Sequence, residues 1–207
     1  MGLILNQSKG FKGDPDRKNL NLLIGKILHF ILENLLVCEK NIEYLFKDKS
    51  LFSQRLGFYL DKALAFYLNL FFERQKIREE IKKTLDQLFE SLEFKNLVSQ
   101  VLRQAKEGYS EVEGFLRNKN SGEVKNLRPD LIFRTSSGWV IFELKFHQLD
   151  ILQDREQLGN YVSLLQNLYP GANIEAYLIV LNPFKIEKQD VTSFTNPTQL
   201  SLFENLS

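Results

Sequence analysis

The chain has 207 residues, of which 43% are hydrophobic, and a single cysteine, Cys38. This length and composition are typical of one globular domain with a substantial core, and one cysteine excludes both an internal disulfide and a cysteine cluster for zinc or iron–sulfur. The formal net charge of +1 provides no general attraction to nucleic acid, so a surface for such a partner would have to be local.

The N-terminal residues lack the basic-then-apolar layout of a signal peptide. No apolar run approaches the length of roughly 20 residues that is needed to cross a bilayer. We therefore expect a protein that is neither exported nor anchored in a membrane. With one cysteine in the chain, a reducing, cytoplasmic setting is the expectation.

Helical patterns fill the first half of the chain. Apolar residues recur every three or four positions over residues 19–39, which predicts a helix that contains His29. On its own, this histidine is interpreted as partly buried and bonded to a neighbour. Residues 54–106 carry broad apolar faces without proline and predict two or three helices, with breaks near Arg74 and Ser91.

After Gly108 the pattern changes to strands. Residues 109–117 alternate as a strand, and residues 128–133 and 139–146 predict a hairpin that turns at Ser136, Ser137 and Gly138. A helix over residues 150–168 and an apolar strand over 174–181 follow. Because a strand, helix, strand order implies a parallel strand pair, the sequence predicts an α/β fold with a central mixed β-sheet flanked by helices.

The predicted hairpin carries three residues that are candidates for a catalytic or metal-binding role. Asp130 and Glu143 each interrupt an apolar strand, and Lys145 follows two residues later. Side chains on a strand alternate between faces, so Glu143 and Lys145 project to the same side while Leu144 turns away. Two carboxylates and an ammonium suit a site that holds Mg²⁺ and activates a water. The alternative is a structural carboxylate–lysine pair at a strand end.

These residues also resemble a known signature. Pro129-Asp130 followed by Glu143-Leu144-Lys145 resembles the PD-(D/E)xK nuclease superfamily. Residues 25–33 (GKILHFILE) look like the G-x-x-x-H-x-x-L-E motif of its RecB/AddA-like branch, and residues 157–161 (QLGNY) look like the Q-x-x-x-Y motif of that branch. Ser110-Glu111-Val112 is similar to the strand that delivers a further acidic residue.

The resemblance implies a restriction-endonuclease-like core in residues 1–188, with a helical insertion at about 40–107. It implies a Mg²⁺ or Mn²⁺ site, a water assisted by Lys145, Glu111 as an auxiliary acid, and Gln157 and Tyr161 steadying the site or contacting the DNA backbone. The metal site would comprise His29, Asp130, Glu143 and Leu144. The side chains of His29, Asp130 and Glu143 should therefore converge on one point with Lys145 beside it.

Basic residues around the hairpin could serve a phosphate backbone. They are Arg117, Lys119, Lys125, Arg128 and Arg134.

Residues 189–207 are expected to form a flexible tail with a separate signal. Gln199, Leu200, Ser201, Leu202 and Phe203 (QLSLF) resemble the pentapeptide that binds the sliding clamp, the β subunit of bacterial DNA polymerase III. Leu202 and Phe203 would be its apolar anchors, and Gln199 its polar contact. The alternative is a segment that docks on its own domain.

The resemblance implies a metal-dependent deoxyribonuclease, an exonuclease or flap nuclease in DNA repair, recombination or replication, and it allows a helicase as partner. Two alternatives stay open. One is a non-catalytic module that uses the same scaffold to bind DNA or a partner, and the other is a site-specific endonuclease.

Overall fold

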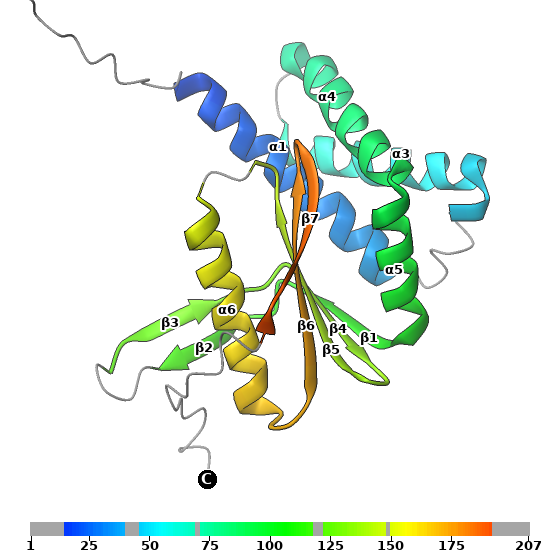
Figure 1. The fold of residues 1–207 in the computed structure, drawn as a ribbon. Helices are drawn as coiled ribbons and strands as arrows, with labels where there is room; N and C mark the ends of the chain where they lie inside the picture. Colours follow the sequence, from blue (N-terminus) through cyan, green and yellow to red (C-terminus); the bar gives the residue numbers. More distant parts are fainter. Residues whose placement is uncertain (1–14, 40–45, 69–70, 118–121, 148–149, 192–207) are drawn as a thin grey trace, which may run out of the picture.

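The computed structural model describes residues 15–39, 46–68, 71–117, 122–147 and 150–191. This part of the chain is α/β, with a five-stranded mixed sheet, a two-stranded sheet and flanking helices (Figure 1). The predicted fold class is confirmed. The pentapeptide at 199–203 lies outside the described residues, and its role stays a prediction.

The five-stranded sheet contains one parallel pair. Its strands, in sheet order, are β1 (Ala105–Ser110), β4 (Leu131–Thr135), β5 (Gly138–Lys145), β6 (Asn173–Leu181) and β7 (Phe184–Gln189). β5 and β6 are parallel, and the other neighbours are antiparallel. Parallel neighbours need a crossover connection, and α6 (Ile151–Leu168) supplies it. The predicted parallel pair is therefore present, whereas β7 was not predicted.

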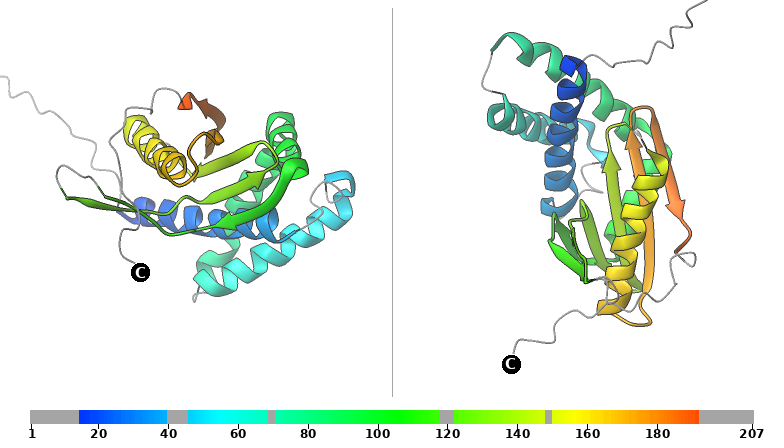
Figure 2. Two further views of the ribbon diagram at one scale, coloured as in Figure 1. Left: turned by 90° about the horizontal axis from the view of Figure 1, so that it is seen from below. Right: turned by 90° about the vertical axis from the view of Figure 1, so that its left-hand side faces the viewer.

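Helices cover both faces of this sheet (Figure 2). α6 lies on one face, and a helical layer lies on the other. That layer comprises α1 (Pro15–Glu33), the π-helical turn η1 (Asn34–Cys38), α3 (Lys49–Tyr67), α4 (Phe71–Glu90) and α5 (Leu92–Gln104). In β5, Phe142 and Leu144 belong to the core shared with this layer, whereas Ile141 belongs to the core shared with α6. The same alternation puts Glu143 and Lys145 on the α6 side.

The β4–β5 hairpin turns where the sequence predicts. Gly138 has φ 148°, and a Cβ there would lie 2.0 Å from the Asn173 carbonyl oxygen, so this position requires glycine. Leu131 pairs with Phe142. β4 begins at Leu131, later than predicted, so Asp130 directly precedes the strand. Extending the register by one residue places Asp130 opposite Glu143.

The helical region breaks near the predicted points. The break expected at Arg74 lies earlier, because α3 ends at Tyr67 and α4 already spans Arg74. The break at Ser91 is confirmed. Its side-chain oxygen accepts a hydrogen bond from the Phe94 N–H and caps the first turn of α5.

The single strand predicted over residues 109–117 is wrong. β1 begins at Ala105, before Gly108, and pairs with β4, whereas β2 (Gly114–Arg117) pairs with β3 (Val124–Leu127) in a separate ribbon. Glu111 lies between them with φ 49°, a left-handed conformation that ends an extended strand. The alternating sequence does not reveal this turn.

The helical stretch Asn19–Cys38 is long and apolar enough, by length and composition, to cross a membrane. The expectation that no such run exists is therefore wrong. Ile24, Ile27, Leu28 and Ile31 are fully buried in the core, which is typical of a core helix.

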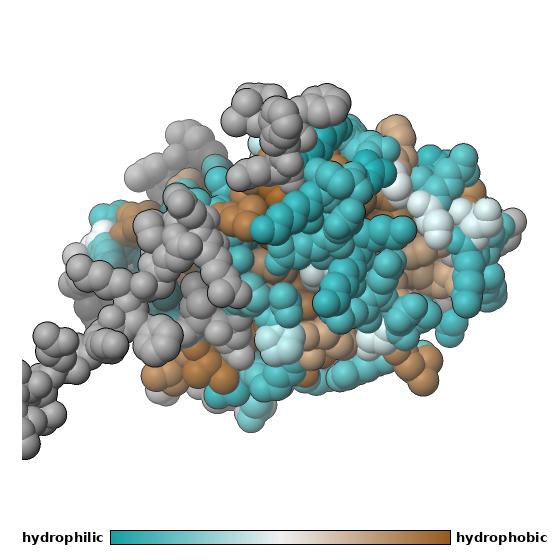
Figure 3. Space-filling view, turned by 90° about the horizontal axis from the view of Figure 1, so that it is seen from above, coloured by the Kyte–Doolittle hydropathy of each residue, from teal (hydrophilic) through white to brown (hydrophobic). Residues whose placement is uncertain are grey.

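Across the face seen in Figure 3, hydrophilic side chains dominate and apolar ones form separate patches.

Candidate active site

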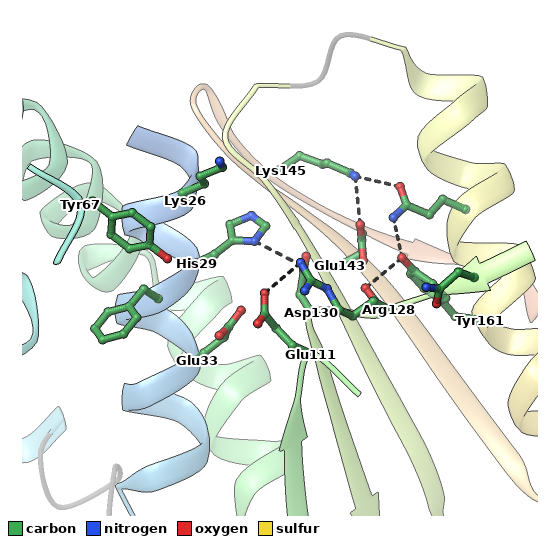
Figure 4. A pocket seen from close by; sticks show the side chains of 13 residues that line it. Lys26, His29, Glu33, Tyr67, Glu111, Arg128, Asp130, Glu143, Lys145 and Tyr161 are labelled. Carbon is green, nitrogen blue, oxygen red and sulfur yellow. Dashed lines mark hydrogen bonds and ion pairs between the residues drawn. The ribbon is translucent and has the colours of Figure 1, made fainter. Parts of the chain in front are cut away.

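A cleft of about 460 Å³ opens between α1 and α6, where β4 begins and β5 ends (Figure 4). The residues that line it are Lys26, His29, Phe30, Glu33, Tyr67, Glu111, Asn126, Arg128, Asp130, Glu143, Lys145, Gln157 and Tyr161. Every residue that the sequence predicts at the nuclease site lies in this lining, with the exception of Leu144.

His29 and Asp130 meet in the cleft from different elements. His29 projects from α1, and its Nδ1 lies 3.3 Å from Asp130 Oδ1. Burial alone would lower the pKa of His29, but the hydrogen bond and charge of Asp130, with the charges of Glu143 and Glu33, raise it above its ordinary value. The histidine therefore faces the acidic cluster, as the resemblance requires, and does not point into a core away from the sheet.

Leu144 supports Asp130 from the backbone. Its side chain is fully buried and carries no atom that could bind a metal. Its backbone N–H donates a hydrogen bond of 2.7 Å to Asp130 Oδ2. This contact orients the carboxylate, and a direct role for Leu144 at a metal stays a prediction.

Glu143 and Lys145 share one face of β5, as strand alternation predicts. Lys145 Nζ lies 2.9 Å from Glu143 Oε1. Glu143 is 2% exposed, and its Oε2 is buried without a hydrogen-bond partner among the described residues. Burial and the nearby charge of Asp130 raise the pKa of Glu143 to about 7, although Lys145 opposes this shift.

Lys145 is held by α6 as well as by β5. Its Nζ donates a hydrogen bond of 2.9 Å to Gln157 Oε1, and the Gln157 amide in turn donates to the Tyr161 hydroxyl. The Tyr161 hydroxyl donates to the Arg128 carbonyl oxygen at 3.2 Å. Gln157 and Tyr161 lie one helical turn apart on α6. Their hydrogen bonds link the lysine to the segment that carries Asp130 and so fix its position.

Asp154 is a site residue that the sequence did not single out. It lies one turn before Gln157 on α6, and its Oδ1 is 3.6 Å from Lys145 Nζ. Asp154 is buried, and its Oδ2 has no hydrogen-bond partner among the described residues. Burial raises its pKa, whereas Lys145 lowers it. Only the spacing to the Q-x-x-x-Y segment could have suggested this residue.

Glu33 is the last residue of the G-x-x-x-H-x-x-L-E motif, and the sequence predicts no role for it in the site. It follows His29 by one turn of α1, so both side chains project from one face. Ligand atoms of His29, Glu33 and Asp130 all lie within 4.8 Å of one another. Burial, followed by the charge of Glu111, raises the pKa of Glu33 to about 7. The i, i+4 spacing with a histidine is the signal that could have identified it.

Glu111 lies at the rim of the cleft. Its carboxylate is 3.3 Å from Arg128, and both side chains are about half exposed, so solvent screens this pair. Its backbone N–H donates to the Asp130 carbonyl oxygen at 3.1 Å. The turn at Glu111 thereby ties the end of β1 to the segment before β4.

The donor set fits a divalent cation. Glu33 Oε1 and Glu143 Oε2 are buried and lack hydrogen-bond partners among the described residues, a costly arrangement that a bound cation would relieve. Carboxylate oxygens suit Mg²⁺ and Mn²⁺, and a neutral imidazole suits Mn²⁺ in particular. His29, Glu33 and Asp130 can each offer one ligand atom to the same ion, and Glu143 lines the same cleft.

The predicted basic surface is partly neutralised in the structure. Arg134 pairs with Glu107 at 3.4 Å, and Lys125 pairs with Glu156 at 3.1 Å. Lys119 lies outside the described residues. The cationic groups in the cleft lining itself are Lys26, Arg128 and Lys145 beside His29.

Comparisons with known proteins leave the family open. A scan against protein families finds no match, and a search of curated proteins finds none either. Among solved structures, the chain is similar to the crystal structure of SSO0001, with 17% sequence identity over 87% of this chain and 85% of that one. The TM-score of 0.32 is low.

Proposed function

We propose that this chain is a Mg²⁺- or Mn²⁺-dependent deoxyribonuclease with a RecB-like PD-(D/E)xK active site. One observation carries the proposal. His29 from α1, Asp130 before β4, and Glu143 and Lys145 from β5 line one cleft with Gln157 and Tyr161 from α6. These are the residues that the motif resemblance selects, and they come from three separate parts of the chain.

The reaction is hydrolysis of a phosphodiester. The oxygen of a water forms a bond to phosphorus, and the bond from phosphorus to one sugar oxygen breaks. The water loses one proton and the leaving sugar oxygen takes one up, so the reaction is balanced. A divalent cation held by His29, Glu33, Asp130 and Glu143 would neutralise charge on the phosphate and activate the water.

Lys145 acts as a donor in this reaction. Burial alone would lower its pKa, but Glu143 and Asp154 raise it, so the amine stays protonated. An ammonium in this position holds the attacking water or stabilises the negative charge that develops on the phosphate oxygens. Its hydrogen bonds to Glu143 and Gln157 fix its direction before substrate binds, and such preorganisation is the main source of electrostatic catalysis.

The proposal is tested with circular, linear and flapped DNA in Mg²⁺, in Mn²⁺ and in chelator. Metal-dependent cleavage that requires a free end or a flap supports an exonuclease or flap nuclease. Cleavage of covalently closed circles at fixed sequences would instead indicate a site-specific endonuclease. Intact DNA in both metals, with binding retained, would show that the scaffold is a non-catalytic module.

The tail is proposed to bring the enzyme to its substrate. If residues 199–203 bind a bacterial sliding clamp, the local concentration of enzyme at DNA rises without strong intrinsic affinity. This agrees with the net charge of +1. Cytoplasmic localisation belongs to the same proposal.

A further inference from the structure

Three aromatic rings extend from the wall of the cleft to the surface. Phe30 and Tyr67 line the cleft. Phe66 stacks on Phe30 with ring centroids 6.4 Å apart and an interplanar angle of 11°. Tyr67 meets both rings edge-on, at 4.9 Å from Phe66 and 6.2 Å from Phe30. We call Phe30, Phe66 and Tyr67 the aromatic edge.

The outer ring of the aromatic edge does not contribute to the core. Phe66 is 73% exposed, so most of the ring that does not contact Phe30 and Tyr67 meets water. Leaving a phenylalanine exposed forgoes the stabilisation that burial of its ring would give. A lone exposed apolar side chain needs no explanation, but a ring that is continuous with a polar cleft is typical of a ligand-binding surface.

Positive charge accompanies these rings. Lys62 Nζ lies 5.7 Å from the centroid of the Phe30 ring, and Lys26 lines the cleft on the same helix as Phe30. Both lysines are exposed. Aromatic faces next to ammonium groups complement a ligand that alternates flat bases with phosphates.

We propose that the aromatic edge binds unpaired bases of single-stranded DNA next to the phosphate that is cleaved. This inference rests on the proposed function and adds its strand preference. Bases in a duplex stack on one another and offer no free face, whereas an unpaired base can stack on Phe66 while its phosphate reaches the cleft. Phe66 belongs to α3, so the helical segment between α1 and β1 supplies this preference.

The test is DNA binding by the full chain in Ca²⁺, with the oligonucleotide confirmed as intact afterwards. Three ligands are compared by fluorescence anisotropy: a single strand, the same strand in a duplex, and a strand of equal length with abasic sites. The variant is Phe66→Ala. The matched control is Phe58→Ala, which removes another exposed phenylalanine of α3. The ring of Phe58 contacts Tyr59, which does not line the cleft, whereas Phe66 contacts the cleft-lining rings of Phe30 and Tyr67.

The wild type should bind the single strand more tightly than either other ligand. Phe66→Ala should weaken single-strand binding by about tenfold, in line with the loss of one stacked base. Its affinity for the abasic strand should not change, because that strand offers no base to stack. Phe58→Ala should match the wild type.

Two outcomes would overturn the inference: equal single-strand affinity of Phe66→Ala and the wild type, or the same loss for the abasic strand. Neither depends on catalysis. If the wild type cleaves DNA but Phe66→Ala has no effect, the proposed function stands and the aromatic edge does not. If the wild type fails to cleave in Mn²⁺ but binding depends on Phe66 as described, the aromatic edge stands and the nuclease proposal fails.

Discussion

His29 Nδ1 lies 3.3 Å from Asp130 Oδ1, a contact that joins α1 to the start of β4 in the central sheet. Asp130 is fixed from its other oxygen by the Leu144 N–H, so the histidine faces an oriented carboxylate. The site therefore depends on α1 staying docked on the sheet.

Lys145→Ala should strongly reduce the rate of cleavage without unfolding the protein. The ammonium is the donor that the proposed reaction uses, and loss of such a group typically lowers the rate by about 10²–10⁴-fold. Initial rates on linear DNA in Mn²⁺ provide the measurement. Lys185→Ala is the control, because this exposed lysine on β7 lies outside the cleft lining. An active Lys145→Ala variant would remove the lysine from the mechanism.

Asp154→Asn should weaken catalysis by acting through Lys145. The carboxylate lies 3.6 Å from Nζ and does not line the cleft, so we expect a roughly tenfold lower kcat with little change in KM. In a Lys145→Ala background the substitution should have no further effect. Glu156→Gln, on an exposed part of the same helix, is the matched control. Additive losses in the double variant would contradict this role.

Glu33→Gln should lower the affinity for Mn²⁺, because Glu33 offers a ligand atom within 4.8 Å of those of His29 and Asp130. Isothermal titration without DNA measures this directly, and a loss of about 10- to 100-fold is expected for a residue that holds or supports a metal. The control is Glu39→Gln, which removes the same charge from a nearby residue that does not line the cleft. Equal affinities of Glu33→Gln and the wild type would exclude Glu33 from the metal site.

The metal-free protein should lose stability as pH rises from about 4.5 to about 7. Glu33 and Glu143 have pKa values of about 7 in the folded protein against an ordinary value of 4.5, so between these values the folded state binds more protons than the unfolded one. His29 acts in the same direction, because its pKa is also raised.

Chemical denaturation in chelator across this range measures the effect, and Glu33→Gln should flatten it. Metal affinity should rise over the same range, because the ligands must lose their protons to bind. Stability of the metal-free protein that increases towards neutral pH would contradict the assignment of these groups.

The double substitution Leu202→Ala and Phe203→Ala should weaken binding to a bacterial sliding clamp by roughly tenfold or more, since it removes both apolar anchors. Cleavage of clamp-loaded DNA should slow, whereas cleavage of bare DNA should not. Equal rates of the wild-type protein on clamp-loaded and bare DNA would rule out the tether.

Much of the fold follows from short-range patterns in the sequence. The β4–β5 hairpin, α6 and β6 have clear periodicities, and strand alternation alone places Glu143 and Lys145 on one side. The split between β1 and β2 could not be predicted, because it depends on the left-handed backbone of Glu111 and on which strand each half pairs with. Such long-range pairing leaves no mark on local alternation.

Only part of the site could be predicted, because some of its residues are identified by long-range contacts and not by local patterns. His29 could be selected only through the motif resemblance, because helical spacing alone indicates a core position. The sequence does not identify Asp154 or Phe66, because the significance of each depends on its contact in the folded chain. Asp154 lies near a lysine on β5, and Phe66 stacks on a ring of α1. Contacts between helices and strands that are distant in sequence become visible only in the folded chain.

The most direct test of a metal-dependent nuclease at this cleft is to measure the rate at which the wild type and Asp130→Ala degrade linear DNA in Mn²⁺, with chelator as the blank. Hydrolysis should appear only in the wild type with metal, and Asp130→Ala should retain the wild-type circular dichroism spectrum. Wild-type protein that leaves DNA intact in Mn²⁺, or Asp130→Ala that cleaves as well as the wild type, would contradict a metal-dependent nuclease at this cleft.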